Sequence, residues 1–213
     1  SGIWSNYTIY KYRNNSFEYN KKYYHFINSY KEIKFDELVR SNSFSGCYSN
    51  QGLIFKNSNL LSFNTNISGS AFEFYNSVDY PRLVSTNIMV DNPLNNFLSV
   101  KYFISCTNEK REDYELYKKT KNYQIYLNEN YNELGFVFNN YISNNEFLSK
   151  NTEEKYNIIN NTIVLNNKQI DKYKDLYKDD VEVYSNTFKF INNGFNAKID
   201  VSKNTLVLYT VPY

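Results

Sequence analysis

The sequence is poor in the residues that build most catalytic and metal sites. Its 213 residues include one histidine, six glycines, three prolines, two cysteines and one methionine. A tetrahedral metal site takes four nitrogen or sulfur ligands, so His25 as the only histidine argues against a metal, and no cofactor is expected. Few glycines leave few loops in which the backbone can approach a phosphate. No phosphate-binding loop, dinucleotide fingerprint or nucleophile elbow occurs, and we expect no catalytic residues in this chain.

Long apolar runs and dense basic blocks are also missing. No stretch reaches the ~18–20 apolar residues that a membrane-spanning helix needs, and no signal peptide is present. The net charge is only +2, from 24 basic and 22 acidic residues. The densest basic cluster, at residues 118–121, follows several acidic residues, which is typical of a solvated surface. Nucleic acid is therefore not an expected partner.

Aromatic residues and asparagine are abundant instead. Twenty-three tyrosines, 16 phenylalanines and one tryptophan accompany an apolar fraction of 41%, which is enough for a core and argues against disorder. One interpretation is codon bias in an AT-rich bacterial genome, with Tyr replacing Leu and Val. The other is carbohydrate binding, because aromatic rings stack on sugars while Asn pairs with hydroxyls through donors and acceptors.

The two cysteines, Cys47 and Cys106, lie far apart in the sequence and outside any CxxC pattern. They fit either a disulfide or two buried free thiols. We prefer free thiols.

Local patterns predict an α+β fold with a mixed N-terminal α/β region. Apolar and β-branched runs favour strands, and helical spacing with capping residues favours helices. Ser70, with Glu73 three residues later, is a candidate capping box for a helix that Pro81 ends. The predicted strands cover residues 7–13, 52–55, 100–105, 122–127 and 135–138, and the other predicted helices cover 35–40, 92–98 and 145–165.

The last forty residues differ from the rest. They alternate apolar and polar residues, with turn sequences at 192–194 and 202–204, which predicts an antiparallel β meander. We therefore divide the chain into a mixed α/β domain (1–178) and an antiparallel β segment (179–213), either packed on that domain or beginning a β-sandwich. Both ends of the chain are abrupt, as in a domain excised from a larger protein.

Four segments, in order, resemble the extracytoplasmic region of the YfhO family of bacterial membrane proteins. They lie at residues 52–75, 92–104, 125–137 and 207–213. Each alone is weakly specific, but their order and spacing agree from about residue 52 to the end. Asn64 stands where the family commonly has His, and Asn132-Glu133 replaces the usual Leu-Pro before Leu134, so a role resting on that His does not transfer.

The resemblance implies a domain on the extracellular face of the bacterial cell membrane, joined to a membrane core through flanking helices outside this chain. The parent would resemble glycosyltransferases that use lipid-linked sugars to modify lipoteichoic acid or other wall polymers. Its catalytic acid would lie near the first membrane helices, which agrees with the missing catalytic residues here. The domain itself would position acceptor polymer or lipid-linked sugar. The alternative is a structural or protein-interaction domain that recruits a partner glycosyltransferase.

The candidate binding residues lie between residues 64 and 75. Asn64, Ser68 and Ser70 are the candidates for sugar hydroxyls, and Tyr75 is the candidate for stacking. The competing interpretation is a capped helix that packs Phe72 and its neighbour Phe74 into the core.

Overall fold

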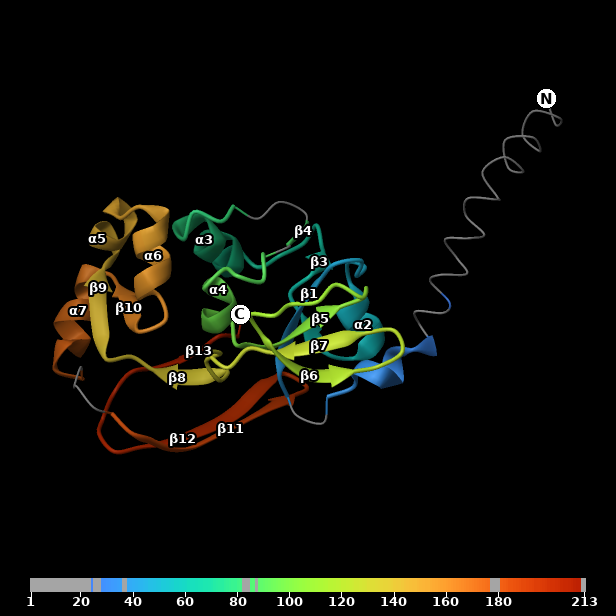
Figure 1. The fold of residues 1–213 in the computed structure, drawn as a ribbon. Helices are drawn as coiled ribbons and strands as arrows, with labels where there is room; N and C mark the ends of the chain where they lie inside the picture. Colours follow the sequence, from blue (N-terminus) through green and yellow to red (C-terminus); the bar gives the residue numbers. More distant parts are fainter. Residues whose placement is uncertain are drawn as a thin grey trace, which may run out of the picture.

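The computed structural model describes residues 24, 28–35, 38–81, 85–86, 88–176 and 181–211, and the strand predicted at residues 7–13 lies outside these. The fold is mixed α+β, as predicted: a five-stranded mixed sheet with helices, followed by antiparallel strand pairs (Figure 1). The elements are η1 (Tyr30–Ile33), β1 (Arg40–Phe44), α2 (Gln51–Phe55), β2 (Ser58–Asn59), β3 (Ser62–Phe63), α3 (Gly69–Ser77), β4 (Ser85–Thr86), α4 (Leu94–Phe97), β5 (Val100–Ser105), β6 (Glu115–Lys119), β7 (Gln124–Leu127), β8 (Gly135–Val137), β9 (Asn140–Ser143), α5 (Asn144–Ser149), α6 (Thr152–Ile158), β10 (Thr162–Leu165), α7 (Asn167–Tyr173), η2 (Lys174–Leu176), β11 (Val183–Ile191), β12 (Gly194–Val201) and β13 (Val207–Tyr209).

The five-stranded sheet has the order β2-β1-β5-β7-β6. Strand β1 runs parallel to both β2 and β5, whereas β7 is antiparallel to β5 and β6. Successive side chains of a strand point to opposite faces. Tyr102 and Ile104 of β5 accordingly pack with Phe55 of α2, while Phe103 packs in a second cluster with Val90. The strand predicted at residues 100–105 is thus confirmed as the centre of the core.

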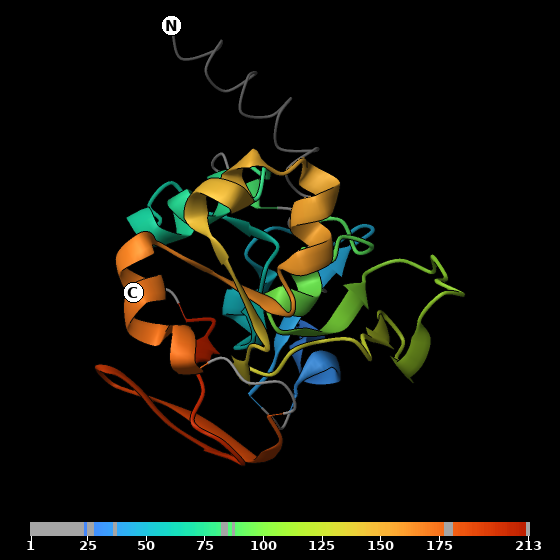
Figure 2. The same cartoon turned by 90° about the vertical axis from the view of Figure 1, so that its left-hand side faces the viewer.

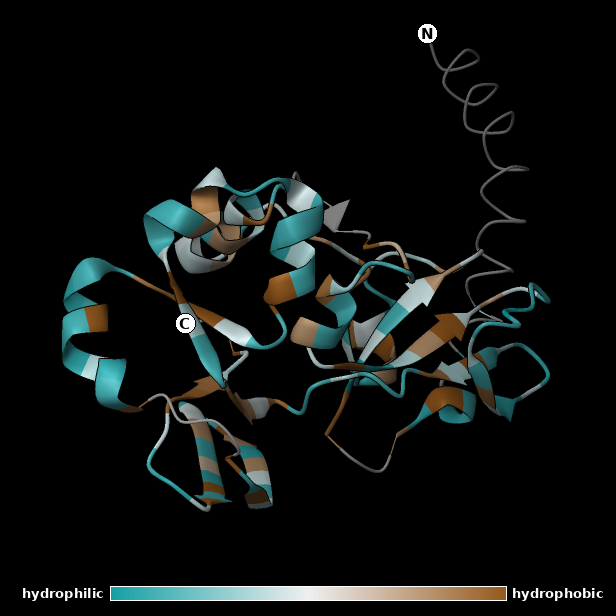
Figure 3. Ribbon diagram, turned by 60° about the vertical axis from the view of Figure 1, so that its left-hand side comes forward, coloured by the Kyte–Doolittle hydropathy of each residue, from teal (hydrophilic) through white to brown (hydrophobic). Residues whose placement is uncertain are grey.

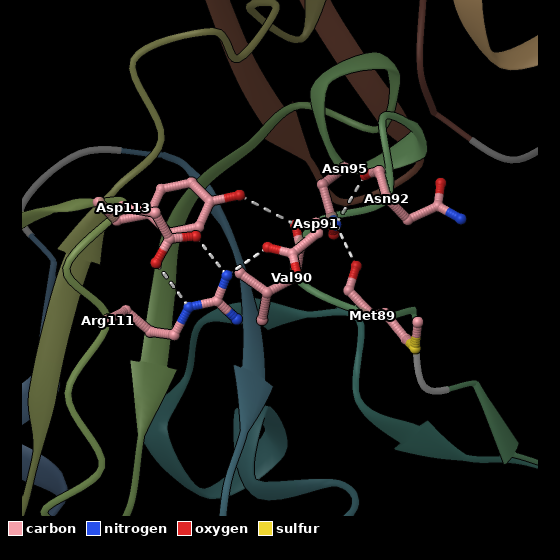
Figure 4. Close-up of polar contacts among 8 residues, drawn as sticks. Met89, Val90, Asp91, Asn92, Asn95, Arg111 and Asp113 are labelled. Atoms are coloured by element: carbon pink, nitrogen blue, oxygen red, sulfur yellow. Dashed lines mark hydrogen bonds and ion pairs between the residues drawn. The ribbon is translucent and has the colours of Figure 1, made fainter.

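Strand β1 lies inside the sheet, yet its buried side chains are polar. Buried amide side chains on and beside this strand form hydrogen bonds with nearby carbonyl oxygens. The Nδ2 of Asn42 donates to the Ile88 carbonyl (2.7 Å) and to Oδ1 of Asn95 (3.0 Å). The Nδ2 of Asn95 in turn lies 2.8–3.0 Å from the carbonyl oxygens of Met89, Val90 and Asn92 (Figure 4). Buried polar groups must be hydrogen-bonded to be tolerated. These asparagines therefore have a structural role, whatever genomic bias also contributes.

A second group of elements joins the parallel pair β9–β10 to helices α5, α6 and α7. Figures 1 and 2 show this group at the opposite end of the molecule from the sheet, with α3 and α4 between them. Helix α6 begins where the sequence predicted, at Thr152, and a capping box between Asn151 and Glu154 fixes its start. The helical prediction for 145–165 fails beyond residue 158, because residues 162–165 pair with β9 as strand β10.

The C-terminal strands form two antiparallel pairs. Strands β11 and β12 make a hairpin, and Figure 3 shows polar and apolar residues alternating along it. The last strand, β13, does not extend this hairpin: it pairs with β8, far back in the sequence. Tyr209 of β13 lies 5.5 Å from the ring of Phe195 and 6.1 Å from that of Phe188, so an aromatic cluster packs the hairpin against the rest of the molecule.

Several local predictions were wrong. Residues 51–55 form helix α2 rather than a strand, between left-handed residues at Asn50 and Lys56, because periodicity cannot assign a four-residue apolar run. Arg40 begins strand β1 rather than ending a helix. The strands at 122–127 and 135–138, which as consecutive strands we expected to be neighbours, do not pair, because β7 lies between β5 and β6. Helix α4 starts at Leu94, after Pro93, and Oδ1 of Asn92 accepts from the Leu94 N–H (2.9 Å).

One ion pair links the segment after α3 to helix α6. The ammonium of Lys155 is 4% exposed and donates to Oδ2 of Asp79 (2.8 Å), which also accepts from the Thr152 hydroxyl (3.0 Å). The Lys155 hydrogen bond holds the pKa of Asp79 below its usual value of 3.8. Among the described residues, Asp79 is the carboxylate that pairs with Lys155, and the ammonium also lies 5.8 Å from the centroid of the Phe147 ring.

We expect Asp79→Asn to lower the free energy of unfolding at pH 7 by about 1–3 kcal/mol. This is below the value for fully buried pairs, because the Asp79 side chain is 41% exposed. Asparagine is chosen because residue 79 has a positive φ, which Asn tolerates. A carboxyl group whose pKa is lower in the folded state than in the unfolded state stabilises the fold. This stabilisation is fully present above the unfolded-state pKa and is lost as the pH falls through the folded-state pKa. The difference between wild type and variant should therefore be constant above about pH 5 and shrink below about pH 4.

The control is Asp171→Asn on α7, whose carboxylate is exposed. Urea unfolding of the three proteins at a series of pH values provides the measurement. A wild-type–D79N difference that stays flat down to pH 2, or that D171N reproduces, would contradict the proposed role of the pair.

Candidate functional site

A disulfide closes the sheet edge at which ligands bind in many α/β proteins. In open sheets the ligand crevice lies beyond the carboxyl ends of parallel strands, where the strand order reverses. Here β1 has β2 on one side and β5 on the other. Beyond the carboxyl ends of β1 and β5, Cys47 and Cys106 form a disulfide with a Cα–Cα distance of 5.0 Å. The preference for free thiols was therefore wrong, because segments 59 residues apart in sequence converge at adjacent strand ends.

Side chains beside the disulfide fill the same edge. The hydroxyls of Ser45 and Thr107 lie 2.8 Å apart. Gly46 has a φ of +73°, and a Cβ there would stand 2.5 Å from the Thr107 methyl. Only glycine fits such a position, so the loop after β1 packs closely against the residues that follow β5.

A cluster of charged residues lies at the surface, where Arg111 faces Asp91 and Asp113 (Figure 4). Arg111 donates to the carboxylates of both Asp91 and Asp113, and its guanidinium holds the pKa of Asp113 below the usual value. One guanidinium faces two carboxylates in this cluster, and the Arg111–Asp91 ion pair joins the loop before β6 to the segment before α4. Within the described ranges no three His, Cys, Asp or Glu side chains are placed to hold a metal ion.

Two neighbouring cavities lie near the amino end of β1. The first, here called the polar cavity, has a volume of about 560 Å³ and is formed largely by the loops that follow α2 and β2. Asparagine and serine side chains share its lining with three leucines and with the exposed ring of Phe63. The lining includes Asn50, Asn57, Asn59, Asn64, Ser58 and Ser62.

Asn57 has the most unusual environment in the polar cavity. Both polar atoms of its side chain, Nδ2 and Oδ1, are buried, and neither has a hydrogen-bond partner among the residues that the structure describes. Leaving such a group unsatisfied costs about 1–3 kcal/mol. Asn59, by contrast, uses its amide to hold Ser41 and Ser43 (2.9 and 2.8 Å). Asn57 is thus an amide beside this cavity whose donor and acceptor are both unused among the described residues. Because the two atoms are buried, a ligand reaches them once the side chain turns into the cavity.

The second cavity, here called the apolar cavity, has a volume of about 360 Å³ and lies between α3, α4 and β13. The rings of Phe74 and Phe97 are stacked in its wall, with centroids 5.2 Å apart. Leu60 and Arg40 line both cavities, so the two are contiguous at these side chains.

Arg40 is fixed by backbone and hydroxyl acceptors rather than by a carboxylate. Its Nη1 donates to the Leu98 carbonyl (2.9 Å) and to the Thr210 hydroxyl (3.0 Å), and its Nη2 donates to the Thr210 carbonyl. Burial lowers the pKa of Arg40 to about 10, and the nearby phenol of Tyr75 opposes this effect. The guanidinium therefore remains protonated at neutral pH.

The four predicted binding residues do not form one site: they lie in the polar cavity, in the apolar cavity and at the start of helix α3. Asn64 lines the polar cavity, while Ser70 and Tyr75 line the apolar cavity. Ser68 caps helix α3 by accepting from the Ala71 N–H (3.3 Å), two residues before the predicted cap. Tyr75 is only 8% exposed and packs in the core. The competing interpretation is half right, because Phe72 is largely exposed whereas its neighbour Phe74 packs against the core.

Sequence reasoning missed Arg40 and Asn57. One signal was available for Arg40: the chain has four arginines against 20 lysines. Where a genome favours lysine, a retained arginine indicates a position that needs a planar, bidentate donor. Asn57 had no such signal, because it is one of many asparagines.

No helix in the described part of the chain has the length and hydrophobicity to cross a lipid bilayer. Comparisons with protein-family models, curated proteins and solved structures give no match to this chain.

Proposed function

We propose that this chain is an extracytoplasmic carbohydrate-binding domain that positions a wall polymer or a lipid-linked sugar for a membrane glycosyltransferase resembling the YfhO family. The observation that carries the proposal is the unpaired amide of Asn57 in the polar cavity. A sugar hydroxyl both donates and accepts, so it satisfies both atoms of such an amide.

The surroundings of Asn57 support a saccharide over a flat apolar ligand. The ring of Phe63 is 52% exposed and lines the same cavity, where it can stack on the apolar face of a pyranose. The Nδ2 of Asn64 adds a donor that has no partner among the described residues, while its Oδ1 accepts from the Asn66 N–H (3.0 Å). Aromatic and amide groups therefore converge on one hollow, the usual arrangement of a small-ligand site.

The Cys47–Cys106 disulfide supports the proposed location. Disulfides persist in oxidising compartments and are rare in the cytosol. A wall-polymer ligand and an extracytoplasmic position are consistent with each other.

Titration of lipoteichoic acid and its component oligosaccharides into 15N-labelled protein tests the proposal. We expect saturable amide shifts around residues 50–64, and we expect Asn57→Ala to weaken binding about tenfold or more. Asn57→Ala should leave stability equal or higher, because it removes buried polar atoms that have no partner. Phe63→Ser should also weaken binding, since it removes the stacking surface.

The matched control is Leu148→Ser, an equally exposed apolar residue on α5 at the opposite end of the molecule. It should bind as the wild type does. An absence of shifts at millimolar saccharide, or equal binding by N57A and wild type, would overturn the proposal.

One observation favours the alternative of a protein-interaction domain. The β11–β12 hairpin exposes Val183, Tyr184, Phe190 and Ile191, and apolar side chains exposed together are typical of protein-interaction surfaces. The same titration separates the two functions, because a domain that only recruits a protein gives no saturable response to saccharide.

A further inference from the structure

Arg40 differs from Arg111 in how its charge is balanced. The exposed Arg111 is held by two carboxylates (Figure 4), whereas Arg40, which is more deeply placed, has only carbonyl and hydroxyl acceptors among the described residues. Removing a charge from water is costly unless a counter-charge or several hydrogen bonds compensate it. Arg40 is therefore a cation whose balancing anion the described protein does not provide.

The hydrogen bonds of Arg40 leave part of the guanidinium unused. A guanidinium has five N–H donors. Three are assigned: two on Nη1 and one on Nη2. The Nε–H and the second Nη2–H remain, and such an adjacent pair binds a carboxylate or phosphate in a bidentate manner.

The apolar cavity beside Arg40 suits the rest of such a ligand. Phe74, Phe97 and Leu208 line it, and its few polar groups include Arg40, Ser70 and Thr210. An inorganic anion would leave these apolar walls unused, and a neutral hydrocarbon would leave the charge uncompensated.

We infer that the apolar cavity binds an amphiphile whose oxyanion, a carboxylate or a phosphate, is received by Nε and Nη2 of Arg40 while its hydrocarbon part packs against Phe74 and Phe97. This goes beyond the proposed saccharide binding, because it concerns a different cavity and does not require a sugar.

The test compares four probes by calorimetry and by amide shifts of the labelled protein, with the detergents below their micelle concentrations. Dodecyl phosphate and dodecanoate should bind saturably, with shifts around residues 70–75, 97–98 and 208–211. Dodecyl maltoside should bind about tenfold more weakly or not at all, since it lacks the charge. Inorganic phosphate should not saturate. Equal binding of dodecyl maltoside would overturn the inference in favour of a purely apolar site, and saturation by inorganic phosphate would overturn it in favour of a simple anion site.

Variants locate the anion at Arg40. Arg40→Gln should weaken dodecyl phosphate binding about tenfold or more. Because Arg40 also holds Thr210, a second pair of variants at the cavity wall makes the test independent of that contact. Ala71→Glu should abolish binding through charge repulsion, whereas Ala71→Gln, of almost the same size, should retain it. Equal loss in both Ala71 variants, or unchanged binding in R40Q, would overturn the inference. Saccharide titration of R40Q and A71E separates the two proposals. If the amphiphile inference fails while the saccharide proposal holds, both variants still bind saccharide.

Discussion

Replacing both Cys47 and Cys106 by serine will lower the free energy of unfolding by about 4 kcal/mol, the larger of two stability effects that we expect. The disulfide closes a loop of 59 residues. The chain-entropy model assigns a cross-link of this length about 4 kcal/mol, through restriction of the unfolded chain. The link also joins the ends of β1 and β5, two adjacent parallel strands in the interior of the sheet.

Guanidinium unfolding of wild type and of the C47S/C106S variant, each with and without dithiothreitol, provides the measurement. Dithiothreitol should lower the midpoint of the wild type and leave that of the variant unchanged. Identical wild-type midpoints in the two conditions would show that the cysteines are not bonded in solution. That result would also remove the support for an oxidising compartment.

Asn95→Asp will lower the free energy of unfolding at pH 7 by about 3 kcal/mol. Asn95 is 1% exposed, and its Nδ2 faces the carbonyls of Met89, Val90 and Asn92. A carboxylate there replaces a donor by an acceptor and leaves those carbonyls unsatisfied, at a cost of about 1–3 kcal/mol for each buried group, and more when it is charged. Oδ1 would still accept from Asn42, so the loss concentrates on the segment before α4.

The pH dependence of this variant identifies the cause. Repulsion by the carbonyls raises the folded-state pKa of the new carboxyl group, so the protonated form is better tolerated. The deficit relative to wild type should therefore shrink as the pH falls from 7 towards 4. Asn66→Asp is the control, because Asn66 is exposed and should show neither the loss nor the pH dependence. A N95D protein as stable as wild type at pH 7 would mean that Asn95 does not organise residues 88–92.

Local signals predicted some elements correctly and failed on others for identifiable reasons. The strand at Val100–Ser105 and the helix start at Thr152 follow from an apolar run and a cap, both of which lie within a few adjacent residues. The run at 51–55 is too short for its hydrophobic periodicity to distinguish a helix from a strand, and tertiary packing makes it a helix. Strand β13 looked like the continuation of a meander, but its partner β8 lies about 70 residues earlier.

For the candidate sites, the sequence pointed to the right region but not to the central residues. Asn64, Ser70 and Tyr75 do line the two cavities. Arg40 and Asn57 were not identified, because what distinguishes them is an absence. Within the described ranges Arg40 has no carboxylate partner, and the Asn57 amide has no hydrogen-bond partner. A missing partner is visible only when every neighbour in space is known.

By itself the sequence determined that residues typical of metal, phosphate and nucleophile sites are scarce in this chain. It also determined that the chain has enough apolar residues for a core and that it combines helices with antiparallel strands. These properties depend on composition and on patterns repeated within a few residues. The tertiary structure alone decided the disulfide, the buried amides and the two cavities that meet at Arg40. Each of these depends on groups brought together over long separations, such as Arg40 and Thr210, which are 170 residues apart. Only the folded backbone fixes such distances.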